Sequence, residues 1–308
     1  MVEARAKLNL GLAVGRARAD GFHDLATVFQ SISLADTLRI EPRRRGFTLA
    51  MRFEDVSARR GARLPQRPMV AAVPRGSANL VLRAARLLAE RHRLAGGARL
   101  TLTKRIPAGA GLGGGSADAA AALVGLSRLY RLRLDPAALL ALGGELGSDV
   151  PFALFGGTAL GLGRGERLRR LRLARPFRAV LAVPNWRVST TGAFRRLDRG
   201  KYGLTHPTAK LRFLQGLGRE GISAERALRL GNTFEEVLGG RRSEFLSLCA
   251  RLRRAGVEGP HLTGSGSAVF GIIPAGLPGM RIVERFAGHE AVYLIRSRQT
   301  GLTRSRLL

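Results

Sequence analysis

The residues that point most directly to chemistry lie in the segment Pro107–Leu123, which reads PAGAGLGGGSADAAAAL. Five of the seven residues from 109 to 115 are glycines, and glycine lets the backbone turn its N–H groups toward a bound ligand. Ser116 is a residue type that caps helix N-termini, and the alanine-rich sequence after it predicts a helix to about Tyr130. Free N–H groups at a helix N-terminus bind phosphate. The segment therefore predicts a site for nucleotide phosphates.

Two other glycine-rich motifs fit this segment less well. A P-loop ends in Gly-Lys followed by Ser or Thr, whereas Gly115 is followed by Ser116 and Ala117. The letters of the dinucleotide-binding fingerprint are present, but the acidic ribose contact expected about 20 residues later is not, because Asp135 precedes Pro136 as a helix cap. The remaining alternative is a small-residue loop that packs a helix against a sheet and binds nothing.

The elements that position this segment can be predicted from the periodicity of apolar residues. Alternation over residues 99–106 predicts a strand directly before the glycines. Alternation over residues 4–14 predicts an N-terminal strand with Lys7 and Asn9 on one face, where they meet either solvent or a ligand. We also expect strands at 25–34, 38–40, 47–53, 178–183 and 291–296, a hairpin at 156–173, a helix capped by Ser77 or Asn79 that runs to Arg93, helices at 137–146, 190–197, 232–238, 242–254 and 280–288, and irregular or mixed structure at 57–75 and 201–221.

The composition is typical of a globular protein with a hydrophobic core. The chain has 308 residues, of which 45% are hydrophobic, and its longest uncharged stretch is too short and too rich in glycine to cross a bilayer. A single cysteine, Cys249, excludes an internal disulfide and fits a reducing compartment. The N-terminus has no apolar signal-peptide core. We therefore expect a cytoplasmic protein, and both a monomer and a homodimer remain open.

The net charge of +30 raises the question of nucleic-acid binding. The excess is almost all arginine, with four lysines among 52 basic residues, and it is spread along the chain rather than gathered in one stripe. Three tyrosines and one tryptophan offer few platforms for base stacking. We expect no specific nucleic-acid partner, although weak, salt-sensitive association stays open.

Three segments, in this order, resemble the three motifs of the GHMP kinase superfamily: Ala6–Leu10, Pro107–Ala119 and Leu262–Phe270. The resemblance extends from about residue 4 to 297. Two further segments, Arg18–Leu25 and Leu146–Phe152, together with the triple glycine at 113–115, resemble one branch of the superfamily, which phosphorylates a cytidine diphosphate methylerythritol.

The resemblance implies an α+β fold with two domains. Residues 1–175 would form an N-terminal domain like ribosomal S5 domain 2, and residues 176–308 a C-terminal ferredoxin-like domain. ATP would lie along the glycine segment, with Mg²⁺ as its metal ion. No metal ligand can be assigned, because Glu145, the one candidate, is more typical of a solvated helix face. The implied ATP contacts are Pro107, Ala108, Gly109, Ala110, Gly111, Leu112, Gly113, Gly114, Gly115, Ser116 and Ala117.

By position in the same motifs, the resemblance implies that Asp149 is the catalytic base and Lys7 its charged partner. An attacking alcohol must lose its proton, which a carboxylate within reach can accept. A nearby lysine keeps that carboxylate ionised and offsets charge on the phosphoryl oxygens. Without the resemblance, Asp149 would be a turn residue at a helix end and Lys7 part of a solvated strand face.

The resemblance also implies a pyrimidine site, in which Phe22 and Phe194 hold the ring between them and His23 contacts its edge. The full set of implied substrate contacts is Asn9, Phe22, His23, Thr190 and Phe194, with Trp186 as an alternative wall. Three residues depart from the branch: Phe22 stands in place of a tyrosine, Ala117 in place of a serine and Ser148 in place of an alanine.

The function implied by these residues is transfer of phosphoryl from ATP to the 2-hydroxyl of that substrate, in the non-mevalonate pathway to isoprenoid precursors. Two alternatives remain open. One is another kinase of the superfamily, acting on homoserine, mevalonate or a sugar. The other is a basic nucleic-acid-binding protein built on an S5-like fold.

Overall fold

The computed structural model describes residues 1–58, 73–200, 221–286 and 290–302. Most of the predictions for 57–75 and 201–221 therefore lie outside the described residues. Within them, helices accompany two largely antiparallel sheets, which confirms an α+β fold.

The larger sheet is built around one long strand, β2. β2 pairs with β1 from His23 to Leu38 and, on its other edge, with β5 and then with β4. All of these pairs are antiparallel, whereas β3 and β4 are parallel. The strands are β1 (Val2–Ala17), β2 (His23–Arg43), β3 (Phe47–Phe53), β4 (Gly97–Lys104), β5 (Thr158–Gly163) and β6 (Arg167–Leu171).

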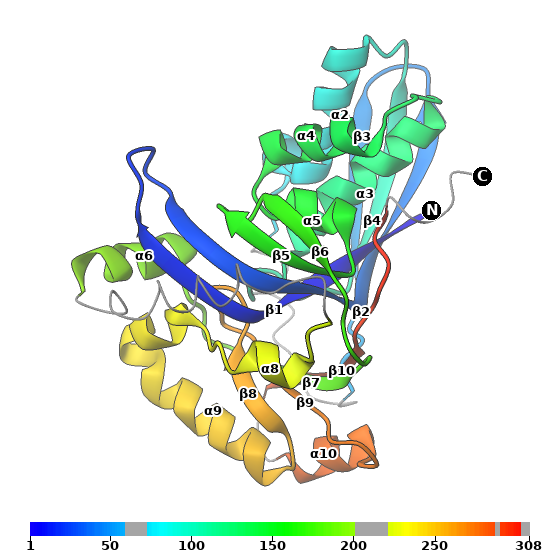
Figure 1. The fold of residues 1–308 in the computed structure, drawn as a ribbon. Coiled ribbons are helices and arrows are strands. Elements are labelled where there is room, and N and C mark those ends of the chain that lie inside the picture. The colour runs from blue at the N-terminus through cyan, green and yellow to red at the C-terminus, as the bar shows by residue number, and fades with distance from the viewer. Residues whose placement is uncertain (59–72, 201–220, 287–289, 303–308) are drawn as a thin grey trace.

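Helices pack against this sheet in the upper part of Figure 1. Nearly all of α3 is buried, because its alanines let neighbouring helices and strands approach closely. The buried helix α3 therefore fixes the position of the glycines that lead into it. The helical elements are η1 (Gly76–Ala78), α2 (Leu80–His92), α3 (Gly114–Leu129), α4 (Pro136–Leu146) and α5 (Val150–Phe155).

The second sheet is antiparallel, with strand order β10-β7-β9-β8. Its strands are β7 (Arg178–Val183), β8 (Glu258–Leu262), β9 (Val269–Ile272) and β10 (Ala291–Arg296). The helical elements around it are α6 (Thr190–Arg199), α8 (Ala224–Leu228), η2 (Thr233–Val237), η3 (Gly239–Arg241), α9 (Arg242–Arg254) and α10 (Gly279–Arg285).

The two sheets share a core. One hydrophobic cluster joins Leu8 and Leu10 of β1 and Ile32 of β2 to Leu181 of β7 and Phe270 of β9. In Figure 1, β1 and β2 run between the upper helices and the second sheet below. The chain therefore has two sheets on one continuous core, and a domain boundary at 175/176 stays a prediction.

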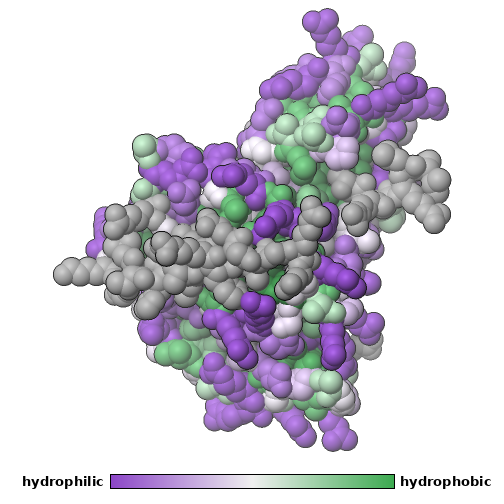
Figure 2. All heavy atoms as spheres, in the orientation of Figure 1, coloured by the Kyte–Doolittle hydropathy of each residue, from purple (hydrophilic) through white to green (hydrophobic). Residues whose placement is uncertain are grey.

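Figure 2 shows hydrophilic residues over both the upper and lower parts of the visible face, not in a single stripe. No helix among the described residues has the length and apolar character needed to cross a membrane.

Several predicted boundaries are wrong. The strands expected at 25–34 and 38–40 are one strand, because Asp36 between them is buried and its carboxylate accepts hydrogen bonds from the backbone of Arg105 and Ile106. The helix expected at 232–238 is the short 3₁₀ helix η2, which spans only Thr233–Val237. Ser116 is not the N-cap of α3: the helix begins at Gly114, with Gly113 as N-cap in the left-handed region at φ 68°.

Candidate active site

The glycine segment forms a loop that runs from β4 into α3. Gly111 has a φ of 82°, and a Cβ there would lie 2.2 Å from the carbonyl oxygen of Thr263, so the close approach requires glycine. The backbone N–H of Lys7 donates to the carbonyl of Leu112 at 3.0 Å, which ties the loop to β1. The Gly113 cap makes no side-chain hydrogen bond to the first turn of α3. The start of this helix therefore offers N–H groups to an anion.

Two cavities meet at this loop. The first, of about 260 Å³, lies between the loop and the start of α2, with Asn79, Lys104 and Asp118 on its wall. The second, of about 390 Å³, lies between the loop, β1, β2 and α6. Gly111, Gly113 and Ser116 line both cavities. A ligand in one cavity can therefore approach a ligand in the other across these three residues.

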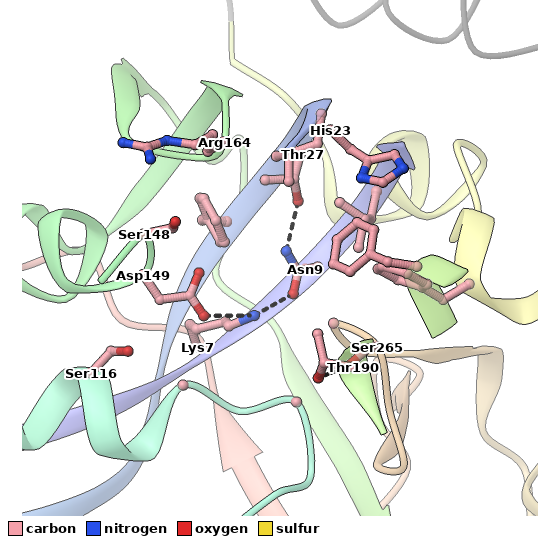
Figure 3. Close-up of a pocket in the computed structure, with 18 of the residues that line it drawn as sticks. Lys7, Asn9, His23, Thr27, Ser116, Ser148, Asp149, Arg164, Thr190 and Ser265 are labelled. Atoms are coloured by element: carbon pink, nitrogen blue, oxygen red, sulfur yellow. Dashed lines mark hydrogen bonds and ion pairs between the residues drawn. The ribbon is translucent and has the colours of Figure 1, made fainter. Parts of the chain in front are cut away.

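Lys7 and Asp149 face each other where the cavities meet (Figure 3). The Nζ of Lys7 lies 3.5 Å from Oδ2 of Asp149 and donates to Oδ1 of Asn9 at 2.6 Å. The lysine side chain is 8% exposed and the aspartate 34%. The lysine is therefore fixed in place, and the carboxylate remains open to the cavity.

Local sequence explains both positions. Lys7 lies between two irregularities in the β1–β2 pairing, and its side chain crosses Gly113, where a Cβ would approach the lysine Cγ to 3.1 Å. Asp149 is the residue before α5, and its carbonyl accepts from Ala153 in the first turn of that helix. The sequence between Gly147 and α5 therefore presents the carboxylate at a helix start.

Asn9 is committed to holding Lys7. Its amide nitrogen donates to the Thr27 hydroxyl at 2.8 Å, and its backbone N–H donates to the Thr263 hydroxyl at 3.1 Å. Because Oδ1 accepts from Lys7, the amide orientation is fixed on both sides. Asn9 lines the second cavity, its side chain also orients the lysine, and its contact with the substrate stays a prediction.

The loop at Leu262–Phe270 closes the site from the second sheet. A Cβ on Gly264 would lie 2.9 Å from the carbonyl oxygen of Gly111, and Ala268 N–H donates to the carbonyl of Ala110 at 3.2 Å. The hydroxyl of Ser265 lies 2.7 Å from that of Thr190 on α6. The two glycine-rich segments are thus in direct contact, although they come from different sheets.

The aromatic residues predicted for the pyrimidine lie at the far end of the same cavity. The rings of His23 and Phe194 are 4.7 Å apart, and Phe194 contacts Phe234 edge-on at 5.0 Å. Phe22 is 47% exposed, and the Arg164 guanidinium lies 4.7 Å from its ring centroid. Trp186, the alternative wall, packs in the hydrophobic cluster beneath and does not line this cavity.

Two other candidates are not brought to the site. Ala117 is buried, lines neither cavity and donates its N–H to the carbonyl of Gly113, so its contact with ATP stays a prediction. Glu145 forms an ion pair with Arg91 on the surface at 2.8 Å, which agrees with the solvated helix face expected for it. Among the described residues, no group of three or more acidic, histidine or cysteine side chains could hold a metal ion.

A buried charge cluster that the sequence did not reveal lies behind the first cavity. Lys104 forms ion pairs with both Asp36 and Asp118, and all three side chains are buried. Burial raises the pKa of Asp118 to about 8, because the charged form is desolvated. Burial alone would lower the pKa of Lys104, but the facing carboxylates of Asp118 and Asp36 raise it above its ordinary value. The cluster connects β2, β4 and α3 directly beneath the glycine loop.

Comparison with known proteins agrees with this geometry. Residues 79–157 match the family model described as the GHMP kinases N terminal domain, which spans α2 to α5. A 4-diphosphocytidyl-2-C-methyl-D-erythritol kinase from Pelotomaculum thermopropionicum is 42% identical over 87% of both chains. One from Moorella thermoacetica is 41% identical over 92% of this chain and 93% of its own. The chain belongs to the 4-diphosphocytidyl-2-C-methyl-D-erythritol kinase family.

Solved structures support the same family and the same fold. A crystal structure of 4-(cytidine 5'-diphospho)-2C-methyl-D-erythritol kinase is 36% identical, covers 96% of this chain and 98% of its own, and superposes with a TM-score of 0.72. A mevalonate kinase from L. major, at 16% identity and a TM-score of 0.67, covers 98% of this chain and 97% of its own and shares the fold alone. The GHMP kinase fold is therefore confirmed. Membership of a kinase family implies a small-molecule substrate, with ATP as co-substrate.

The motif segments identified in the sequence contain most of the residues that line the second cavity, but not all of them. Thr27 and Arg164 line the second cavity from outside the motif segments. Ser265 lies within the third motif and could have been named from it. For Lys104 a signal was available, since a lysine is rare in a chain whose basic residues are almost all arginine.

Proposed function

We propose that the protein is an ATP-dependent kinase that phosphorylates the 2-hydroxyl of 4-diphosphocytidyl-2-C-methyl-D-erythritol in the non-mevalonate pathway to isoprenoid precursors. Family membership supports the substrate. The observation that carries the chemistry is the Lys7–Asp149 pair, which lies where two cavities join at the start of α3.

The first cavity suits ATP, and the second suits the phosphoryl acceptor. Backbone N–H groups at the start of α3 would hold the phosphates, as helix N-termini do in other nucleotide sites. The γ-phosphoryl would then reach the shared wall at Gly113 and Ser116, within range of an alcohol in the second cavity. Phosphoryl transfer needs mainly this positioning and charge stabilisation.

Asp149 would accept the proton of the attacking hydroxyl. Its carboxylate is 34% exposed and lines the cavity, and the Lys7 ammonium lies 3.5 Å from it. The same ammonium would offset the negative charge on the transferring phosphoryl oxygens. The hydrogen bond to Asn9 holds the ammonium of Lys7 in place for both roles.

The donor atoms near the shared wall fit Mg²⁺. Mg²⁺ in phosphoryl-transfer sites is held by one or two carboxylates, water and substrate phosphates rather than by a protein cage. The hydroxyl of Ser116, which lines both cavities, would hold it here together with water and the phosphate oxygens. When bound, Mg²⁺ would neutralise charge on the β- and γ-phosphate oxygens.

The far end of the second cavity suits the cytidine diphosphate. Phe22 and Phe194 offer ring faces to the pyrimidine, and base–aromatic stacking contributes about 1–3 kcal/mol per base. His23 and Thr190 offer polar atoms, and Arg164 is a cation suited to the diphosphate. The single, buried Cys249 is consistent with work in the reducing cytoplasm.

The experiment that tests this function is an ADP-release assay with the cytidyl substrate, mevalonate and homoserine. Of the three acceptors, we expect only the cytidyl substrate to be phosphorylated. For Asp149→Asn we expect kcat to fall on the order of 1,000-fold, with little change in substrate affinity. Glu145→Gln, which removes a surface carboxylate from the preceding helix, is the matched control and should keep full activity. Full activity of Asp149→Asn would overturn the mechanism, and turnover of mevalonate alone would overturn the substrate.

A further inference from the structure

His23 is held from one side only. It begins β2, its side chain is buried, and its Nε2 lies 2.7 Å from Oδ1 of Asp198 on α6. Its ring packs against Phe194, on the same helix. The described residues offer no hydrogen bond to Nδ1 of His23. His23 therefore has one ring nitrogen hydrogen-bonded to the protein, and its side chain lines the second cavity (Figure 3).

Helix α6 presents its contributions to this cavity at regular spacing. Thr190, Phe194 and Asp198 are four residues apart and so lie along one face of the helix. Thr190 contacts Ser265, and Phe194 contacts His23. The helix is fixed by the Arg196 guanidinium, which donates to the carbonyl of Val237 at 2.6 Å. Asp198 therefore belongs to a rigid element whose other residues already line the site.

The contact with Asp198 determines which ring nitrogen of His23 carries the proton. A carboxylate can only accept, so Nε2 must donate to Asp198. In a neutral imidazole, donation from Nε2 leaves Nδ1 without a proton, as a hydrogen-bond acceptor. Asp198 itself is 46% exposed and, among the described residues, makes no other contact that would explain its position.

We propose that Asp198 is a positioning residue that fixes the His23 tautomer and thereby makes the site prefer cytosine over uracil. Cytosine carries an amino donor at its fourth ring position, whereas uracil carries a carbonyl acceptor there. With Nδ1 as an acceptor, His23 can accept a hydrogen bond from the amino group of cytosine, whereas it would be repelled by the carbonyl oxygen of uracil. This inference rests on the proposed function, because it assumes that a cytidine moiety occupies the cavity.

The first test measures this preference by steady-state kinetics at about pH 8. The substrates are the cytidyl compound and its uridyl counterpart. For Asp198→Ala and Asp198→Asn we expect the ratio of kcat/KM for the two substrates to fall by about tenfold, because alanine removes the acceptor and asparagine can also donate. The change should be a rise in KM for the cytidyl compound, while kcat and the KM for ATP stay unchanged.

Two variants separate positioning from a general effect of charge. Asp198→Glu keeps an acceptor near Nε2 and should retain part of the preference. Asp24→Asn removes an exposed carboxylate next to His23 that pairs with Arg18, so it should leave the ratio unchanged. A ratio that stays at the wild-type value in Asp198→Ala would overturn the proposal.

Nitrogen NMR of the free, isotope-labelled protein tests the tautomer without any turnover, with the His23 signals assigned by their loss in His23→Gln. We expect the wild type to carry its proton on Nε2 and Asp198→Ala to show a mixture of tautomers. An unchanged tautomer in Asp198→Ala would overturn the positioning role. Absence of turnover with the cytidyl compound in the wild type would instead overturn the proposed function, and the NMR result would still decide the role of Asp198.

Discussion

At the scale of single residues, the site depends on how firmly one lysine is held. Lys7 has the Asn9 amide oxygen at 2.6 Å, the Asp149 carboxylate at 3.5 Å and the Phe29 ring centroid at 5.5 Å. A lysine side chain in water samples many rotamers, and these contacts remove that freedom before any substrate binds. The charge is therefore already in place when the phosphoryl group arrives.

Replacing Lys7 with methionine keeps the length of the side chain and removes its charge. We expect kcat to fall on the order of 100-fold or more, because the transferring phosphoryl oxygens lose their protein cation. Arg5→Met, on the same strand but paired with Glu3 on the surface, is the matched control. Equal loss in both variants, measured by ADP release, would contradict a specific role for Lys7.

The buried carboxyl of Asp118 gives a prediction about pH. Because burial raises its pKa from 3.8 to about 8 in the folded protein, the folded state holds this proton where the unfolded state releases it. Its contribution to stability is complete below about pH 4 and is lost as the pH rises to about 8. The free energy of unfolding should therefore fall more steeply between about pH 5 and 8 in the wild type than in Asp118→Asn. Urea unfolding at several pH values measures both slopes, and equal slopes would contradict the raised pKa.

At the scale of elements, the glycine segment illustrates what a sequence can and cannot predict. Its composition predicted a strand, a loop and a helix in the right order, and the family motif predicted its ligand class. The start of the helix was misplaced because Ser116 is a good cap by type, whereas the left-handed Gly113 caps the helix here. Residue type alone does not reveal φ, and φ decides where this helix begins.

Gly113 can be tested by adding one methyl group. Gly113→Ala would place a side chain at φ 68° and a Cβ 3.1 Å from Lys7 Cγ. We expect a loss of roughly 1–2 kcal/mol in stability from the left-handed backbone and a marked fall in kcat as Lys7 is displaced. Gly144→Ala on α4, where a Cβ meets nothing within 4 Å, should instead add up to about 1 kcal/mol of stability at full activity. Thermal unfolding with ADP release checks both, and a fully active Gly113→Ala would contradict the account.

Strand prediction failed at Asp36 for a similar reason. A polar residue between two apolar runs indicates a turn, but this carboxylate is buried and its acceptors are used by Arg105, Ile106 and Lys104 at the end of β4. Those partners lie about 70 residues away in sequence, so local patterns could not reveal them.

At the scale of the whole molecule, the site exists because two sheets share one core. Lys7 comes from the first sheet, Thr190 and Ser265 from the elements of the second, and the cavity between them contains all three. The sequence could place each residue in a motif but could not predict contacts such as Thr190 with Ser265. Such contacts follow from how the sheets pack, which requires the tertiary structure.

The shared core predicts that the two sheets unfold together. Trp186, the single tryptophan, lies just after β7 and reports on the second sheet, whereas far-ultraviolet circular dichroism reports on the whole chain. Because one hydrophobic cluster joins both sheets, we expect the two signals to give coincident urea transitions. Separate transitions would indicate two independently stable domains.

The central claim is that Asp149 and Lys7 direct the γ-phosphoryl of ATP onto the 2-hydroxyl of the cytidyl substrate. Phosphorus NMR of the products of a single turnover tests it most directly, because the spectrum identifies the oxygen that receives the phosphoryl group. For the wild type we predict a new phosphate monoester on the 2-hydroxyl and stoichiometric ADP, and for Asp149→Asn neither within the same time. A monoester on another hydroxyl, or ATP hydrolysis without transfer, would contradict the account.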